Sequence, residues 1–168
     1  QVFLQTLEQA REMRMAVRKL WCDEAQFDTV QQLDDPLQEE LHGLLEYAVL
    51  ASHRQAFDPM ETAIGEAGQW LLAGTEHLHA DWTLVDDYPL SREMMAMSRV
   101  WQSPDRRAYL IAAKGAPEAI VDLCHLDSER SAAIAIQVAR MASAGLRVLG
   151  VAQATFHAEA LPDNQHDF

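Results

Sequence analysis

The stretch RAYLIAAKGAPEAIVDL, residues 107–123, is the most informative part of this sequence. Its first part, residues 107–113, is rich in aromatic and branched apolar side chains, which predicts a β-strand. Gly115 then frees the backbone for a sharp turn, and Pro117 is well placed as the first residue of a helix. The stretch therefore predicts a strand that turns directly into a helix.

Lys114 stands at the point where this strand ends and the turn begins. A helix start has unpaired N–H groups and a partial positive charge, both of which suit a phosphate or another anion. With an ammonium beside it, the turn predicts an anion pocket. The alternative is an ordinary strand, turn and helix whose lysine is solvated.

Strand and helix patterns alternate on both sides of this stretch. Turn residues at 103–105 predict that the strands on either side of them form an antiparallel hairpin. The predicted strands are residues 13–21, 82–88, 95–102, 107–113 and 146–152. The predicted helices run over residues 36–51, 60–72, 117–123 and 128–144. We therefore expect an α+β fold, a twisted antiparallel sheet flanked by helices, in a single domain over residues 1–168.

Composition narrows the range of partners. The chain has a net charge of −13, which argues against a nucleic-acid partner and against adsorption to anionic lipid. Any anionic ligand must then rely on a local cluster such as Lys114, Arg92 and Arg147. Two cysteines, Cys22 and Cys124, give no disulfide framework, so free thiols in the cytosol are the simpler interpretation.

Four stretches, in order, resemble motifs of P-type cation-pumping ATPases. Lys114–Glu118 (KGAPE) resembles their nucleotide-pocket signature. The other three are FDPMETAI at 57–64, YPLSR at 88–92 followed by MSRV at 97–100, and GLRVLGVA at 145–152. The resemblance covers most of the chain and is greatest to bacterial calcium-ATPase-like pumps. It implies the α+β fold of their nucleotide-binding (N) domain.

The resemblance also implies roles for individual residues. Lys114 and Gly115 would form the pocket floor near the adenine ring and the phosphates, and Glu61 would accept the adenine amino group. Arg92 and Arg147 would each contact phosphate. The alternatives are a solvated lysine, a first-turn glutamate that favours the helix dipole, and two surface ion pairs. Glu118 is interpreted as structural, since a carboxylate early in a helix is expected on helix grounds alone.

Two positions depart from the family pattern, and both concern adenine. Leu90 stands where the family has a stacking phenylalanine, although Tyr88 could substitute for it. Met95 stands where the family often has another lysine. These changes predict loose, unselective nucleotide binding. The alternative for Met94, Met95 and Met97 is plain sheet core.

Other motifs of the pumps are missing from these 168 residues. The phosphorylated Asp-Lys-Thr-Gly-Thr, the Thr-Gly-Glu loop and the magnesium-binding Gly-Asp-Gly do not occur, nor does an apolar run of about 20 residues or a signal peptide. We therefore expect an ATP-binding domain on the cytoplasmic face of a membrane pump. It would hold MgATP for an aspartate in a neighbouring domain, contain no catalytic residue and not turn over ATP alone.

The expected partners are ATP and the phosphorylation and membrane domains of the same polypeptide, with the isolated domain a monomer. Residues 1–12 match nothing in the family and are expected to be frayed or foreign to the domain. Residues 163–168 are expected to lead back toward the phosphorylation domain. The alternative function is a non-enzymatic interaction or regulatory module whose nucleotide pocket has decayed.

Two further candidates carry less chemistry. His77-Leu78-His79 would place two imidazoles on one strand face, a spacing that can bind zinc, but no third ligand is evident and no metal site is predicted. Cys124-His125 is adjacent on a helix, so the two side chains point apart and form no nucleophile–base pair.

Overall fold

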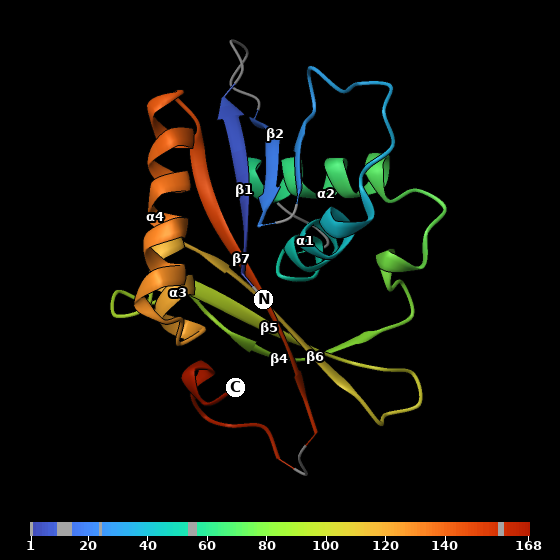
Figure 1. Ribbon diagram of the computed structural model, residues 1–168. Helices are drawn as coiled ribbons and strands as arrows, with labels where there is room; N and C mark the ends of the chain where they lie inside the picture. The colour runs from blue at the N-terminus through green and yellow to red at the C-terminus, as the bar shows by residue number, and fades with distance from the viewer. Residues whose placement is uncertain (1, 10–14, 24, 54–56, 158–159) are drawn as a thin grey trace.

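A seven-stranded sheet forms the centre of the computed structural model, which describes residues 2–9, 15–23, 25–53, 57–157 and 160–168. Every neighbouring pair of strands is antiparallel, in the order β3-β2-β1-β7-β6-β5-β4 (Figure 1). The strands are β1 (Val2–Gln9), β2 (Met15–Cys22), β3 (Ala25–Asp28), β4 (Thr83–Tyr88), β5 (Ala96–Gln102), β6 (Tyr109–Gly115) and β7 (Arg147–Phe156). This confirms the predicted α+β class.

Four α-helices and two short 3₁₀ turns accompany the sheet in the described ranges. They are α1 (Glu39–Leu50), α2 (Pro59–Leu71), α3 (Pro117–Leu123), α4 (Ser128–Ser143), η1 (Glu76–Leu78) and η2 (Gln165–Asp167). Figure 1 shows α1 and α2 against one face of the sheet and α3 and α4 against the other. We call these the α1–α2 face and the α3–α4 face.

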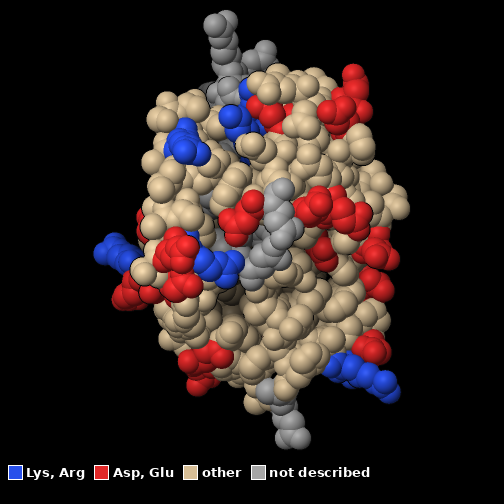
Figure 2. Space-filling view, in the orientation of Figure 1, with Lys and Arg blue, Asp and Glu red and all other residues tan. Residues whose placement is uncertain are grey.

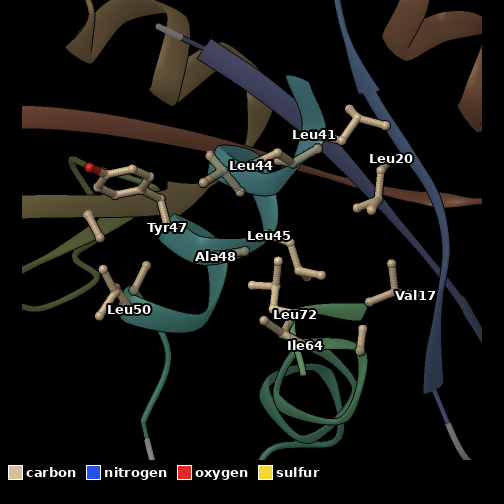
Figure 3. Close-up of a cluster of buried hydrophobic side chains, with 14 of the residues drawn as sticks. Val17, Leu20, Leu41, Leu44, Leu45, Tyr47, Ala48, Leu50, Ile64 and Leu72 are labelled. Atoms are coloured by element: carbon tan, nitrogen blue, oxygen red, sulfur yellow. The ribbon is translucent and has the colours of Figure 1, made fainter. Parts of the chain in front are cut away.

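The larger apolar core lies on the α1–α2 face (Figure 3). Helix α1 contributes one fully buried stripe at helical spacing, Leu41, Leu44, Leu45 and Ala48. This stripe packs between the sheet and α2, whose Ile64 is also fully buried. Helix α1 therefore contributes to the core of the domain. Because the core fixes α1 and α2 against the sheet, it also fixes the residues at their ends.

Local signals explain where two helices begin and end. Asp58 caps α2, since its carboxylate accepts from the backbone N–H of Met60 (2.8 Å) and of Glu61 (3.2 Å). Asp127 caps α4 in the same way through Arg130 N–H at 2.8 Å. Gly145 ends α4 with φ of +80°, in the left-handed region that glycine adopts without strain. These boundaries agree with the sequence analysis.

Other boundaries differ from the predicted ones. Two strands, β1 and β3, were not predicted, and Val2–Gln9 lies between β2 and β7 rather than fraying. Residue 1, residues 10–12 and the first two residues of the predicted strand 13–21 lie outside the described residues. The first helix begins at Glu39 rather than at 36, because residues 36–38 are irregular and Gln38, just before the helix, has an extended backbone.

The last residues of the chain pack on the α3–α4 face. Gln165 is buried there, where its side chain meets Ser98 Oγ (2.6 Å) and Ala96 O (3.3 Å). The Phe168 ring stands edge-on to the rings of Tyr88 and Phe156. Residues 163–168 thus cover part of the sheet in this structure.

None of the helices in the described ranges combines the length and apolar character needed to span a bilayer.

Candidate functional site

Lys114 lies in β6 with its side chain on the α1–α2 face. Side chains alternate along a strand, so Ala112 and Lys114 face α1 and α2 while Ala113 faces α3. Lys114 is only 5% exposed. The alternative of a solvated lysine is therefore wrong, and a buried ammonium needs partners.

Glu61 is the main partner of Lys114. It stands in the first turn of α2, where the Asp58 cap fixes the start of the helix. Lys114 Nζ lies 2.5 Å from Glu61 Oε1, and Glu61 is itself only 9% exposed. Burial lowers the pKa of Lys114, and the nearby Glu61 carboxylate opposes that shift. Two residues chosen from separate motifs thus form one buried ion pair.

Ser52 is the second partner of the ammonium, at the C-terminal end of α1. Its hydroxyl accepts from Lys114 Nζ at 3.0 Å and donates to Ala48 O at 2.8 Å. Ser52 is almost fully buried. The hydroxyl therefore bridges the last turn of α1 and the ammonium of β6.

Arg99 reaches the same serine from β5. Its Nη1 donates to Ser52 O at 2.7 Å, and its Nε lies 3.8 Å from Asp87 Oδ2 on β4. The guanidinium also stands 5.4 Å from the ring centre of Trp101, whose indole N–H donates to Leu50 O at 2.7 Å. Two side chains of β5 thus hold the end of α1.

Gly115 has a different role from the predicted one. It does not make the sharp turn, because it is the last residue of β6 and has no positive φ. A Cβ there would stand 2.6 Å from Ala96 Cα and closer still to Met95 O. The glycine is required because the start of β5 lies against it, held by Ala116 N–H to Met95 O at 2.9 Å.

The predicted anion pocket of Lys114 and the following helix is wrong. Helix α3 does begin at Pro117, but Ile120 packs it on the α3–α4 face, against Ala113 and Ala152. The Lys114 side chain points to the opposite face. One residue of strand separates the ammonium from the turn, and strand alternation sends the two features to different sides of the sheet.

The remaining predicted residues do not join the pair directly. Leu90 (57% exposed) and Met95 (52% exposed) belong to the segment between β4 and β5, and Arg92 in the same segment is exposed. Arg147 is exposed at the start of β7. The structure therefore brings Lys114 and Glu61 together and leaves the other charged candidates on the surface.

Tyr88 lies on the other side of the sheet from Lys114. It pairs with Ser98 across β4 and β5, and its hydroxyl donates to Pro162 O. Its ring contacts Phe168. Tyr88 therefore cannot substitute for the stacking aromatic beside Lys114, because its side chain is on the α3–α4 face and Lys114 is on the α1–α2 face.

Three methionines near the site occupy different environments. Met97 is half-buried and pairs with Lys114 on the neighbouring strand. Met94 packs with the core of the α3–α4 face, and Met95 is exposed. The sheet-core alternative therefore fails for Met95. An exposed methionine one residue before β5 presents an apolar surface near Gly115.

His77 and His79 do not lie on a strand, contrary to the prediction. They belong to η1 and its end, and both imidazoles contact one carboxylate, Glu46 of α1 (His77 Nδ1–Oε2 2.8 Å). No local pattern in the sequence reveals this partner, because Glu46 is more than 30 residues away in the chain. Within the described ranges, no group of three or more His, Cys, Asp or Glu side chains is arranged to hold a metal ion.

Charge on the surface is mostly acidic. Figure 2 shows acidic side chains spread over one face, with basic ones few and scattered. The chain carries 26 acidic and 13 basic residues, so no broad basic surface is expected to attract an anion. An anionic ligand would depend on individual cations.

The comparisons with known proteins define the class to which the chain belongs. Residues 51–168, most of the chain, match the family described as "P-type ATPase, cytoplasmic domain N". The chain therefore belongs to the family of P-type ATPase cytoplasmic N domains.

One relative gives a more particular comparison. The chain is 31% identical over 93 residues to "Probable cation-transporting ATPase I" of Mycobacterium leprae (strain TN). The match covers 54% of this chain but 6% of that protein, so the chain corresponds to a small part of this relative.

Proposed function

We propose that this domain binds ATP around the Lys114–Glu61 pair. The observation that supports this proposal most directly is the 2.5 Å contact between Lys114 Nζ and Glu61 Oε1. Each residue was chosen from a different motif, and the two lie 53 positions apart in the chain. A carboxylate acceptor beside an ammonium suits a ligand such as ATP, which carries both an amino group on its base and anionic phosphates.

The pair keeps some capacity for a ligand. An ammonium has three N–H donors, and among the described residues Glu61 and Ser52 take two of those of Lys114. The third would serve the nucleotide. The second oxygen of Glu61 would accept the adenine amino group, as the family resemblance implies.

Exposed apolar side chains near the starts of α2 and β5 would cover the base. Phe57 is 98% exposed immediately before the cap of α2, and Leu90 and Met95 are more than half exposed between β4 and β5. Phe57 would supply the aromatic face that Leu90 lacks. Arg92 and Arg147 would meet the phosphates as the only strong cations of the predicted set that are exposed. Mg²⁺ would come with the nucleotide.

In the parent protein the domain would deliver the γ-phosphate to an aspartate of a neighbouring domain and drive cation transport, with the motifs resembling bacterial calcium-ATPase-like pumps most. Positioning of a reactant can lower a barrier by several kcal/mol without any residue of this domain reacting. The isolated domain would be monomeric and would not turn over ATP, because Asp-Lys-Thr-Gly-Thr does not occur in it.

One observation favours a second function, an interaction module with a decayed pocket. Lys114 and Glu61 are buried and neutralise each other's charge. Leu90 and Met95 also replace the stacking phenylalanine and the second lysine of the family. If that function holds, ATP would find no site.

The test is an ATP titration of the isotope-labelled chain, followed by backbone amide NMR with millimolar MgATP. Saturable shifts around Gly115, Glu61 and Arg92 are expected, and they should vanish in Lys114→Met. The matched control is Lys19→Met, because Lys19 on β2 is the other lysine of the chain.

Because Lys114→Met would also lose ATP binding if it failed to fold, a second variant tests for a gain of binding. Leu90→Phe with Met95→Lys restores the family pattern and should tighten ATP binding by about tenfold or more, from stacking and added charge. If neither the natural chain nor this double variant shifts with ATP, the interaction-module function replaces the proposed one.

A further inference from the structure

We propose that Arg99 is a positioning residue for Lys114 and acts through Ser52. The family resemblance assigns no role to Arg99, although Arg99 lies within the matched stretch MSRV at 97–100. The inference rests on the proposed nucleotide function of Lys114, but its first readout requires no nucleotide.

The path consists of three consecutive contacts. Arg99 Nη1 donates to the carbonyl oxygen of Ser52, the Ser52 hydroxyl accepts from Lys114 Nζ, and that hydroxyl also donates to Ala48 O. Arg99 fixes the backbone of Ser52 through its carbonyl oxygen, and the bond to Ala48 O then sets the direction of the hydroxyl.

Ser52 needs such an anchor because it lies beyond the regular helix. Helix α1 ends at Leu50, and only the Ser52 N–H, which donates to Val49 O at 3.0 Å, continues its hydrogen bonding among the described contacts of the Ser52 backbone to α1. The last carbonyls of a helix have no intrahelical partner. Arg99 supplies one for Ser52, and it does so from the sheet, which is the same rigid element that carries Lys114.

Arg99 is itself held on several sides. It is 6% exposed, stands over the Trp101 ring and has Asp87 3.8 Å from its Nε on the neighbouring strand. A planar guanidinium fixed on two sides can orient a carbonyl in a way that a flexible ammonium cannot. The strand register also places Arg99 near Lys114. Met97 pairs with Lys114 and Arg99 pairs with Ala112, so Arg99 lies two residues further along the same face of the sheet.

The experiment uses lysine labelled with ¹³C and ¹⁵N in the full 168-residue chain. The sequence has two lysines, so the side-chain spectrum has one signal for Lys114 and one for Lys19, which serves as an internal reference. In Arg99→Met, the Lys114 ¹³Cε and ¹⁵Nζ signals should move toward those of a solvated lysine while Lys19 stays in place. ATP affinity should fall about tenfold, the equivalent of one hydrogen bond to a charged group.

A charge effect must be separated from a positioning effect. The positive charge of Arg99 adds to burial in lowering the pKa of Lys114, so its removal alone could alter the signal. In Ser52→Ala the charge remains but the hydroxyl is gone. This variant should reproduce the Lys114 shift, and Arg99→Met added to it should change ATP affinity by less than about twofold, because coupled residues are not additive.

Two further variants keep the outcome decisive. Arg99→Lys keeps the charge without the fork and should lie between the natural chain and Arg99→Met, which also covers the case in which Arg99→Met does not fold. Gln165→Ala removes buried hydrogen bonds on the α3–α4 face and should leave both lysine signals unchanged.

The proposal is overturned if Arg99→Met or Arg99→Lys lowers stability without moving the Lys114 signal. It is also overturned if Arg99→Met has its full effect in the Ser52→Ala background, since Arg99 then acts by charge alone. A chain that fails to bind ATP while the Lys114 signal responds as expected would refute the proposed function and leave the positioning role intact.

Discussion

The two faces of the sheet carry different kinds of buried polar chemistry. On the α1–α2 face, Lys114, Glu61 and Arg99 are ionic groups under the largest apolar core. On the α3–α4 face, the buried polar contact is neutral, between Ser98 and Gln165. Strand β5 contributes to both faces, because Ser98 and Arg99 are consecutive residues. Along β5, strand alternation therefore places the charged Arg99 on one face and the neutral Ser98 on the other.

This contrast between the two faces indicates where a binding function should lie. A buried ion pair costs desolvation and is weak evidence for stability, whereas a neutral hydrogen bond is a modest net gain. We expect the α1–α2 face to be retained for binding and the α3–α4 face for packing. Substitutions on the first face should therefore affect both stability and ATP, and those on the second only stability.

The largest expected effect is that of Lys114→Met. It leaves the Glu61 carboxylate buried without its cation, and the free energy of unfolding should fall by about 3–5 kcal/mol. Urea unfolding of the variant measures this loss, and ATP binding should disappear with it.

Glu61→Gln added to Lys114→Met is the matched control, since it removes the unpaired charge. It should regain most of the lost stability without regaining ATP binding. A loss below about 1 kcal/mol in Lys114→Met would show that water screens the pair and that the contrast between the faces is smaller than stated.

The next effect concerns the contact between β5 and β6. Gly115→Ala places a methyl against the backbone of Met95 and Ala96, which cannot rotate away, so a loss of about 1–3 kcal/mol is expected. Gly65→Ala in α2 is the control. No atom lies within 4 Å of its added methyl, and helix propensity should stabilise the chain by up to about 1 kcal/mol. Thermal unfolding of the two variants should therefore move in opposite directions.

A smaller effect is expected for a substitution on the α3–α4 face. Gln165→Ala removes the hydrogen bonds to Ser98 and to Ala96 O, and the free energy of unfolding should fall by about 1–2 kcal/mol. ATP affinity should stay within about twofold of the natural chain, because Gln165 is on the far side of the sheet from Lys114. A larger loss of affinity would mean that the two faces are coupled.

The smallest effect is a pH dependence on the α1–α2 face. Burial, aided by the Glu46 charge, raises the pKa of Tyr47 to about 12 from its usual 10.0. Between these values the unfolded chain has lost the phenolic proton and the folded chain has kept it, so stability falls as pH rises. At pH 10.5 the loss should be under about 1 kcal/mol.

Tyr47→Phe isolates this contribution. Urea unfolding at pH 8.5 and pH 10.5 should show a smaller decrease in the variant than in the natural chain. The Lys114 pKa, which is lowered on folding, gives the opposite slope, but it is present in both proteins and cancels in the comparison. Equal decreases in both proteins would contradict the raised pKa of Tyr47.

Much of the fold could be predicted from local signals. The cap at Asp127, the glycine at 145 and the turn at 103–105 each act within a few residues, and the structure keeps all three. Strand β1 could not be predicted, because residues 2–9 carry no turn signal or clear alternation, and only pairing with β2 and β7 makes them a strand.

The candidate site divides in the same way. From the sequence alone, Lys114 and Glu61 could be named as candidate binding residues, because each belongs to a motif, and the α+β N domain could be predicted. The contacts of Ser52 and Arg99 with the pair, the position of Tyr88 on the far face and the start of α3 away from the ammonium follow from the three-dimensional packing. These contacts join residues 47 to 62 positions apart. The packing of α1 and α2 on the sheet sets such distances, and no local pattern encodes them.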